Sequence, residues 1–430
     1  MNNNICEIRD PIHGYIHISE VEKEIIDSSL FQRLRRIRQL SGAHLTYPGA
    51  QHSRFEHSIG TMHLGGLTGN IILKKTPINK DFIQELRLAS LLHDIGHGPF
   101  SHLIEEVMTE KHGITHETVT QRVILETEIK DILNRHGFDP NAISEFIVGL
   151  STKRPRFMSD IVGGGLSVDI MDYLLRDSYF TGVEYGKVDI LRIINSFELK
   201  DDKLALNQAA LYAFEALMIA RYEMFRAVYF HRTVRASELM LIRSISLADE
   251  ILGLTDTNDL NKYLQQNDET TLNLLVNISD DQKELKQSRD LAINYRDRNL
   301  VKCVYEKTIH RKDQLMESIF LQKSIREDLV RKIAEEANVP PDEVYLDVST
   351  TPSVPLTSAR QALTSIILAT TNSNGLKYEE VRVDELPLIG AISGFFNILR
   401  VYTSNINRKT VEEASSKTFG ESSYSSKISM

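Results

Sequence analysis

One short stretch constrains the fold of this chain more than any other. Residues 88–102 read LASLLHDIGHGPFSH, and ten of these residues hold four side chains able to bind a metal ion or transfer a proton: His93, Asp94, His97 and His102. Upstream, the apolar residues Phe82, Leu86 and Ala89 recur at helical spacing, and His93 continues the same face. An unpaired imidazole in a protein core is costly, so this histidine needs a partner.

Helix breakers follow this face immediately. Gly96, Gly98 and Pro99 end the helix, and proline suits the first position of the next helix because its missing N–H is not needed there. A break between two buried helices can direct adjacent side chains toward one centre, which an unbroken helix cannot easily do. A lone histidine is more often a hydrogen-bonded core or surface residue, but this density of ionisable groups beside helix breakers favours a functional site.

Composition sets the class of protein. The chain has 430 residues, of which 41% are hydrophobic and 25% charged, as expected for a soluble globular protein with two domains or one domain and an appendage. The formal net charge of −9 argues against general coating of nucleic acids, although a local basic site remains open. Two cysteines give neither a disulfide framework nor a zinc-finger spacing. Without a signal peptide or an apolar run near the ~20 residues of a membrane span, we expect a cytoplasmic protein.

Helical periodicity dominates the larger, N-terminal part of the chain. We expect a mainly α fold, with a helical bundle core over residues 1–300. Alternating patterns and turn residues predict short β-hairpins at 5–18 and 195–206, and a long helix is expected at 207–233.

The sequence texture changes after residue 300. Strand-like runs mixed with helices at about 317–338 and 387–401 predict a smaller α/β region over residues 301–402. The stretch 403–430 is rich in Ser, Thr and Lys and has few large apolar groups, which predicts a disordered tail.

The histidine cluster suggests a metal site of mixed ligands. A divalent ion needs neutral imidazoles and ionised carboxylates, and two aspartates would cancel its charge. His93 and Asp94 are the first pair, and further ligands must come from helices that pack on them, such as His57 and an acidic residue at 169–177. Such ligands suit Mn, Fe, Co, Ni, Zn or Mg, and the residues do not choose between these metals. The ion would activate water and neutralise charge on a phosphate.

Three more histidines are candidates for proton transfer. His97, His102 and His116 could transfer protons or contact phosphate oxygens near neutral pH. Glu105 follows His102 by three residues, and Glu117 is next to His116. A neighbouring carboxylate raises the pKa of an imidazole and favours its proton-donating form.

A basic run near the N-terminus has two interpretations. The segment FQRLRRIRQL contains four arginines: Arg33, Arg35, Arg36 and Arg38. Such a run is usually a solvated helix face, and the alternative is an anion or nucleotide site. The charge of the segment alone does not decide between a solvated face and an anion or nucleotide site.

Six motifs in chain order resemble one known family: RDPIHGYIHI, FQRLRRIRQL, YPGAQHSRFEHSIG, LLHDIGHGPFSH, THE and VDIMDYLLRD. A His, a His-Asp pair and a distant Asp form the signature of the HD-domain phosphohydrolases, and the fuller set resembles the deoxynucleoside triphosphate triphosphohydrolases. The likeness is to the branch that contains the vertebrate enzyme with a SAM and an HD domain, without the SAM domain. It covers residues 5–235 well and the C-terminal region loosely.

This resemblance implies an HD-domain helical core that hydrolyses a deoxynucleoside triphosphate (dNTP) to deoxynucleoside and inorganic triphosphate, with Mg²⁺ accompanying the nucleotide. The metal ligands it implies are His57, His93, Asp94 and Asp169. The residues it places along the reacting phosphate are His97, His102, His116, Glu117 and Arg54. Those it assigns to the sugar and the rest of the substrate are Gln39, Tyr173, Asp177, Arg221 and Tyr229. Helical spacing agrees, because Asp169, Tyr173 and Asp177 share one helix face.

The family also has a guanine-nucleotide activator site, for GTP or dGTP, which helps to assemble a tetramer. Its base-recognising positions match Asp27, Gln32 and Arg35. The resemblance therefore implies allosteric activation and a homo-oligomer, either a dimer or a tetramer, and gives the basic run a specific role.

Two departures from the family pattern keep other functions open. Ile170 replaces a lysine that grips phosphate, and Phe230 replaces a polar residue. Another nucleotide or a phosphomonoester is therefore an alternative substrate for an HD-type phosphohydrolase. The basic run motivates a third hypothesis, a nucleotide-sensing or single-stranded nucleic-acid-binding module with a structural metal, which the net charge disfavours.

Overall fold

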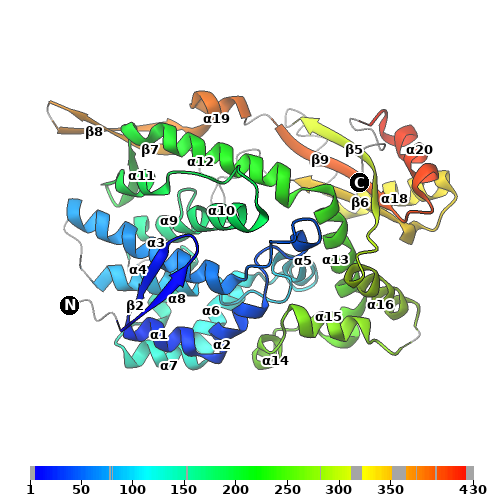
Figure 1. Cartoon of the computed structure of the whole chain (residues 1–430), viewed down its shortest axis with the longest axis horizontal. Coiled ribbons are helices and arrows are strands. Elements are labelled where there is room, and N and C mark those ends of the chain that lie inside the picture. Colours follow the sequence, from blue (N-terminus) through cyan, green and yellow to red (C-terminus); the bar gives the residue numbers. More distant parts are fainter. Residues whose placement is uncertain are drawn as a thin grey trace.

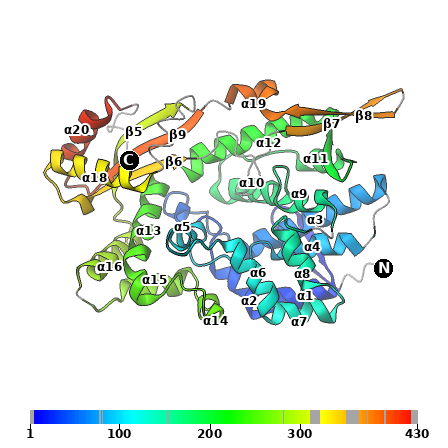
Figure 2. The ribbon, with the colours of Figure 1, turned by 180° about the vertical axis from the view of Figure 1, so that it is seen from behind.

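The computed structural model of the chain describes residues 5–76, 79, 81–151, 154–280, 282–310, 322–350, 365–373, 375–392 and 395–422. Helices make up most of it, so the mainly α fold is confirmed, and a smaller α/β unit lies at one end of the helical body (Figure 1). The view from behind shows the same division (Figure 2). Within these residues, no helix combines the length and the apolarity needed to cross a lipid bilayer.

The chain opens with the predicted β-hairpin. Strands β1 (Cys6–Asp10) and β2 (Gly14–Ile18) pair antiparallel, with Asp10 opposite Gly14. Helices α1 (Glu20–Asp27) and α2 (Ser29–Gln32) follow, and the 3₁₀ helix η1 (Arg33–Arg36) continues them. The break between α1 and α2 lies at Ser28, because its hydroxyl accepts the N–H of Phe31 and caps the second helix.

The helical core packs around α3 (Arg54–Lys75), which is buried along most of its length. This helix starts at a capping box formed by Ser53 and Glu56. Glycines on α3 allow close approach, because a Cβ at Gly65 would lie 2.6 Å from the hydroxyl oxygen of Ser90 on the neighbouring helix. The other elements of this part are η2 (Ala43–Leu45), α4 (Asp81–Leu92), α5 (His102–His112), α6 (His116–Glu126), α7 (Glu128–Arg135), α8 (Pro140–Ile147), α9 (Arg156–Gly163), α10 (Val168–Thr181) and α11 (Ile190–Asn195).

The long helix predicted at 207–233 is interrupted in the structure. The turn η3 (Gln208–Ala210) leads into α12 (Leu211–Met224), which ends in the π-helical turn η4 (Phe225–Tyr229). The next helix, α13 (Arg232–Leu252), starts after His231, whose ring nitrogen Nδ1 accepts the N–H of Thr233. A histidine that caps a helix cannot be distinguished from an interior one by apolar spacing. After α13 come α14 (Leu260–Leu264), α15 (Asp268–Val276) and α16 (Lys283–Arg296).

Two sheets contain the C-terminal strands. The predicted pair β3 (Phe197–Lys200) and β4 (Lys203–Asn207) is antiparallel, and β4 also pairs in parallel with β7 (Ser365–Asn372), which pairs with β8 (Gly375–Arg382). The second sheet has the order β5-β9-β6, with all neighbours antiparallel. Its elements and the segments around it are β5 (Lys302–His310), α18 (Lys323–Ala337), η5 (Pro341–Glu343), β6 (Val344–Thr350), η6 (Val383–Glu385), α19 (Pro387–Ile392), β9 (Phe395–Thr403) and α20 (Arg408–Phe419).

Two predictions for the C-terminal region are wrong. The expected helix at 387–401 continues only to Ile392, and β9 then forms the central strand of its sheet. The expected disordered tail at 403–430 contains α20, because Val411 and Ala414 are spaced to bury one helix face against α18 and β5. Residues 423–430 lie outside the described part of the chain, and the division at residues 300 and 402 stays a prediction, since this region contributes strands to both sheets.

Candidate active site

Four side chains from three segments meet at the predicted metal centre. His57 lies on α3, His93 and Asp94 follow the end of α4, and Asp169 is in the first turn of α10. His57 Nε2 lies 3.1 Å from Asp169 Oδ1 and 3.7 Å from Asp94 Oδ2. His93 Nε2 lies 3.3 Å from Asp94 Oδ1 and 3.7 Å from Asp169 Oδ1. Residues predicted from distant parts of the sequence therefore converge closely enough to share one ion.

Both imidazoles are oriented so that Nε2 is available to a metal ion. His57 Nδ1 donates to Asp172 Oδ2 over 2.8 Å, and His93 Nδ1 donates to the carbonyl of Ser90 over 2.8 Å. These partners only accept, so Nδ1 carries the proton and the lone pair belongs to Nε2. Both Nε2 atoms are buried and make no hydrogen bond. Buried nitrogens facing two carboxylates are therefore suited to hold a divalent cation.

The electrostatics of this centre match a site for positive charge. Burial lowers the pKa of His57, but the carboxylates of Asp169 and Asp172 outweigh it and raise that pKa to about 10. Burial raises the pKa of Asp94, but His93 and Arg54 hold it well below its usual range. The carboxylates therefore stay ionised, and a proton and a metal ion compete for His57.

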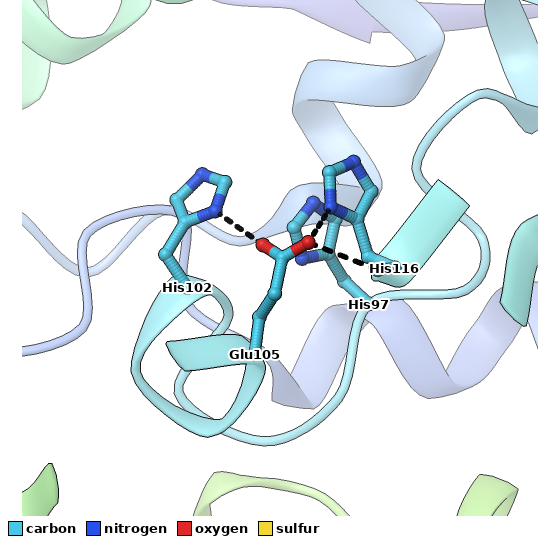
Figure 3. A group of neighbouring side chains, drawn as sticks. All are labelled: His97, His102, Glu105 and His116. Atoms are coloured by element: carbon cyan, nitrogen blue, oxygen red, sulfur yellow. Dashed lines mark hydrogen bonds and ion pairs between the residues drawn. The ribbon is translucent and has the colours of Figure 1, made fainter. Parts of the chain in front are cut away.

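A second group of ionisable side chains consists of His97, His102, Glu105 and His116 (Figure 3). Glu105 on α5 accepts from His102 Nδ1 over 2.9 Å, and from both the backbone N–H and Nδ1 of His116, over 2.9 Å and 2.6 Å. The ring of His97 stacks on that of His116 with centroids 3.9 Å apart. His97 Nε2 lies 3.4 Å from Asp94 Oδ1, so this histidine joins the two groups.

Glu105 is the residue that the sequence prediction left out of the site. We expected Glu117 to be the partner of His116, but the structure pairs His116 with Glu105 instead. Burial raises the pKa of Glu105, and its contacts with His102 and His116 outweigh burial and lower it. Glu105 lies on α5, the helix that follows the glycines. Its position three residues after His102 was the sequence signal that could have placed it in the site. Nδ1 of His102 and of His116 is therefore held by one carboxylate, and the second nitrogen of each ring can exchange a proton or bind a ligand.

The helix break between the two groups is a tightly held turn. Phe100 and Ser101 both have left-handed φ angles, 56° and 53°. The N–H of Phe100 donates to Asp268 Oδ1 over 2.7 Å. Ser101 Oγ accepts from Arg54 Nε over 2.7 Å, while the Arg54 guanidinium also pairs with Asp94. The turn therefore fixes Arg54 at the metal centre, where the resemblance places a phosphate contact.

The basic run does not form one solvated face. Arg33 is buried, and its Nη2 donates to the carbonyls of Ile95 and His97 over 3.0 and 2.8 Å. Arg38 Nη1 lies 3.6 Å from Asp268 Oδ2. Two of these arginines therefore support the metal-site loop and the turn beside it, and only Arg35 and Arg36 are exposed.

Three of the expected substrate residues contact one another, and the other two have buried polar atoms without partners. Tyr229 donates to Asp177 Oδ2 over 2.7 Å, and the ring of Tyr173 lies edge-on to that of Tyr229, 6.5 Å between centroids. Arg221 is buried, and its Nε and Nη1 make no hydrogen bond. The buried side-chain oxygen of Gln39 also makes none. Buried polar atoms without partners are expected where a polar ligand supplies them.

His52 was not among the site residues predicted from the sequence, and the structure places it in this group. Its Nε2 lies 2.8 Å from Asp177 Oδ1. Its ring stacks on that of Phe180, with the ring centroids 4.7 Å apart. One nearby signal was its position next to the segment SRFEH, which starts α3.

The expected activator residues are partly brought together. Arg35 Nε donates to Gln32 Oε1 over 2.8 Å, and the Arg35 guanidinium lies 3.5 Å from the ring centroid of Phe55. Asp27 pairs instead with Lys23 on the surface of α1.

The two departures from the family pattern have packing roles in the structure. Ile170 is 3% exposed and packs in the main hydrophobic core. Phe230 packs against Phe225, with ring centroids 5.4 Å apart, and its carbonyl accepts from Arg400 over 2.7 Å. Neither replacement therefore removes a charge from the four metal ligands.

Family models and known proteins agree with this arrangement. Residues 54–177 match the model of the HD domain, and residues 188–369 match that of the HD associated region. An uncharacterised protein of Bacillus subtilis, YwfO, is 36% identical over 56% of this chain and 56% of its own length. The chain spans about half the length of the curated relatives it matches first.

A named relative and a solved structure extend the likeness. The Dictyostelium discoideum protein named deoxynucleoside triphosphate triphosphohydrolase SAMHD1 homolog is 32% identical over 70% of this chain and 60% of its own length. The crystal structure of a hypothetical protein from Aquifex aeolicus superposes with a TM-score of 0.74 at 27% identity, covering 95% of this chain and 99% of that one. The HD domain match contains all four expected metal ligands and Glu105. The chain therefore belongs to the HD-domain proteins, with the HD domain followed by an HD associated region.

Proposed function

We propose that this protein hydrolyses dNTPs to deoxynucleoside and inorganic triphosphate. The observation that carries the proposal is that Asp177, bonded to both Tyr229 and His52, lies two helical turns along α10 from Asp169. This spacing suits a nucleoside whose sugar hydroxyl meets Asp177 while its 5′-phosphate reaches the metal centre. The name of the Dictyostelium relative supports the same substrate class.

The residues have distinct roles in this proposal. His57, His93, Asp94 and Asp169 hold one divalent ion, of the group Mn, Fe, Co, Ni, Zn or Mg. When bound, the ion lowers the pKa of a water molecule and neutralises charge on the phosphate. Arg54, held by Asp94 and Ser101, contributes fixed positive charge beside the same phosphate.

Proton transfer falls to the histidines around Glu105. Attack of water on the α-phosphorus breaks its bond to the 5′-oxygen of the sugar, and that oxygen needs a proton as it leaves. Glu105 keeps a proton on Nδ1 of His102 and of His116, so the other ring nitrogen of each can donate or accept the transferred proton. His97 and Glu117 complete the set expected along the phosphate, and Mg²⁺ would accompany the nucleotide.

Product analysis tests this assignment directly. Purified protein is incubated with each dNTP in the presence of Mg, Mn, Fe, Co, Ni or Zn, and products are separated by anion-exchange chromatography. We expect equal amounts of deoxynucleoside and triphosphate, with ¹⁸O from labelled water found in the triphosphate. Nucleoside monophosphate with pyrophosphate would show that the α–β anhydride is cleaved instead, and free phosphate alone would show removal of a terminal phosphate. Either result would contradict the proposed reaction.

An inactive control separates catalysis from a structural role of the metal. Asp94→Asn removes one charged ligand and should abolish turnover while the circular dichroism spectrum is retained. An unfolded Asp94→Asn variant would instead support the view that the ion is a structural support.

Activation and assembly form a second part of the proposal. We expect GTP or dGTP to bind near Gln32 and Arg35 and to promote a dimer or tetramer. Gln32→Ala and Asp27→Ala should weaken activation and assembly, measured by turnover and by light scattering, more than they lower basal turnover. Equal losses in basal and activated turnover would argue against a separate effector site.

A further inference from the structure

A buried network connects the N-terminal hairpin to the metal ligand His57. Asp172 on α10 is fully buried and accepts four hydrogen bonds: His57 Nδ1 at 2.8 Å, His13 Nε2 at 2.6 Å, and Arg176 Nε and Nη2 at 2.8 and 2.9 Å. A carboxylate has about four lone-pair positions, so Asp172 has none left for a metal ion or a transferred proton. Its role is to orient His57.

The segment between β1 and β2 supports Asp172 in two ways, directly through His13 and indirectly through Asp10, which binds Arg176. Asp10 Oδ1 accepts the N–H groups of Ile12 and His13, each over 2.8 Å, and so fixes the turn that presents the His13 ring. The other oxygen of Asp10 accepts from Arg176 Nη1 over 2.9 Å. Both sides of this turn therefore act on the same carboxylate, one through His13 and one through Arg176.

The sequence of α3 leaves room for this network. A Cβ on Gly60 would lie 2.0 Å from Asp172 Oδ1 and 2.4 Å from Arg176 Nη2. Gly60 is one turn after His57, so its missing side chain lets the buried carboxylate and guanidinium approach the helix that carries the ligand. Within the described residues, the network links β1–β2, α3 and α10 at one point.

We propose that the N-terminal hairpin is a positioning element of the metal centre, with His13 and Asp172 as positioning residues for His57. The Asp172 carboxylate keeps the Nδ1 proton on His57, so that its Nε2 lone pair faces Asp94 and Asp169. His13 and Arg176 prevent Asp172 from rotating away. Loss of either support lets the His57 ring reorient, and metal affinity falls although no ligand has been removed.

Metal binding measured without substrate tests this inference, so its outcome does not depend on the proposed dNTP hydrolysis. Co²⁺ is titrated into the metal-free protein against a competing chelator, and the visible absorption of bound Co²⁺ reports its ligand geometry. We expect His13→Ala to lower Co²⁺ affinity about tenfold and Asp172→Asn to lower it by about 10- to 100-fold, with altered absorption in both. His13→Gln keeps a donor for Asp172 and should restore most of the affinity.

A matched variant separates positioning from general destabilisation. Glu22→Gln removes a buried carboxylate of another network, with Arg87 and Gln84, and touches none of the metal ligands. It should lower thermal stability but leave Co²⁺ affinity and absorption unchanged. The inference is overturned if Glu22→Gln weakens Co²⁺ binding as much as His13→Ala does. It is also overturned if folded His13→Ala binds Co²⁺ with the affinity and absorption of the unmodified protein. The Co²⁺ titration of His13→Ala therefore decides the question even if Asp172→Asn does not fold.

Discussion

The hydroxyl of Tyr229 donates to the carboxylate of Asp177 across 2.7 Å, joining the π-helical turn η4 to helix α10. The extra residue of a π turn rotates the side chains that follow it, and such turns are frequent at functional sites. Here the turn places a tyrosine from the predicted long helix against the same carboxylate that His52 contacts.

Tyr229→Phe tests whether this pair recognises the sugar. Removing a hydrogen bond to a charged group should lower kcat/KM for dNTPs by about 10- to 100-fold, since such bonds contribute about 1.5–3 kcal/mol. A 3′-deoxy analogue, which lacks the hydroxyl, should show little difference between the two proteins. Tyr212→Phe, at an exposed position, serves as the control. A uniform loss with both substrates would place Tyr229 outside sugar recognition.

Glu105→Gln tests the proton-transfer group. An amide cannot accept from His102 and His116 on both of its polar atoms, so the proton positions of the two rings are no longer fixed. We expect kcat to fall about 10²-fold, with metal affinity unchanged and an altered pH profile. Glu110→Gln on the exposed side of α5 should match the unmodified protein. Loss of bound metal in Glu105→Gln would show that this group is part of the cation site.

Glu22 makes stability depend on pH. Burial raises the pKa of this carboxyl, but its bonds to Arg87, Ser19 and Gln84 outweigh burial and lower it. Because the folded-state pKa lies below the unfolded one, the stabilisation is complete above about pH 4.3 and is lost as the pH falls through the folded-state value.

In urea unfolding at pH 7, Glu22→Gln should therefore reduce the free energy of unfolding by about 3 kcal/mol, because Arg87 loses a buried partner. The difference in the free energy of unfolding between the variant and the unmodified protein should become smaller as the pH is lowered below about 4.3. Glu20→Gln, exposed in the first turn of the same helix, should change little at either pH. A difference independent of pH would contradict a role for the ionised carboxylate.

Val411→Ala tests the packing of α20, the helix found where a tail was expected. Val411 is fully buried among residues of β5, β9 and α18, so its loss should lower the stability of the small α/β unit by about 2 kcal/mol. Lys409→Ala, at an exposed position of the same helix, serves as the control. Unchanged urea unfolding of Val411→Ala would mean that α20 contributes little.

Local sequence patterns predicted elements and ligands well where one segment contains its own signal. The hairpin at 5–18 and the strand pair near residue 200 needed only alternation and turn residues. The four expected metal ligands could be named only because the motif resemblance supplied the long-range pairing of His57 with Asp169, which spacing alone cannot supply.

The parts that sequence reasoning missed depend on tertiary partners. Asp172 and His13 are separated by more than 150 residues, and nothing local marks them as partners. Glu105 was noticed beside His102, but its bond to His116 required the turn at Phe100 and Ser101 to be known. β9 was mistaken for a helix because its apolar run is short, and α20 was missed because composition outweighed the spacing of its few apolar residues.

The parallel pairing of β4 with β7 has a consequence for biosynthesis. Ala205 lies opposite Ile367, so a growing polypeptide must be extended by more than 150 residues beyond β4 before that pairing can form. The ribosome therefore releases the HD domain well before the edge of β4 is paired, and the backbone N–H and C=O groups of that edge stay open during the interval. Chaperones that recognise an open strand edge have their longest opportunity on this protein at that stage of translation.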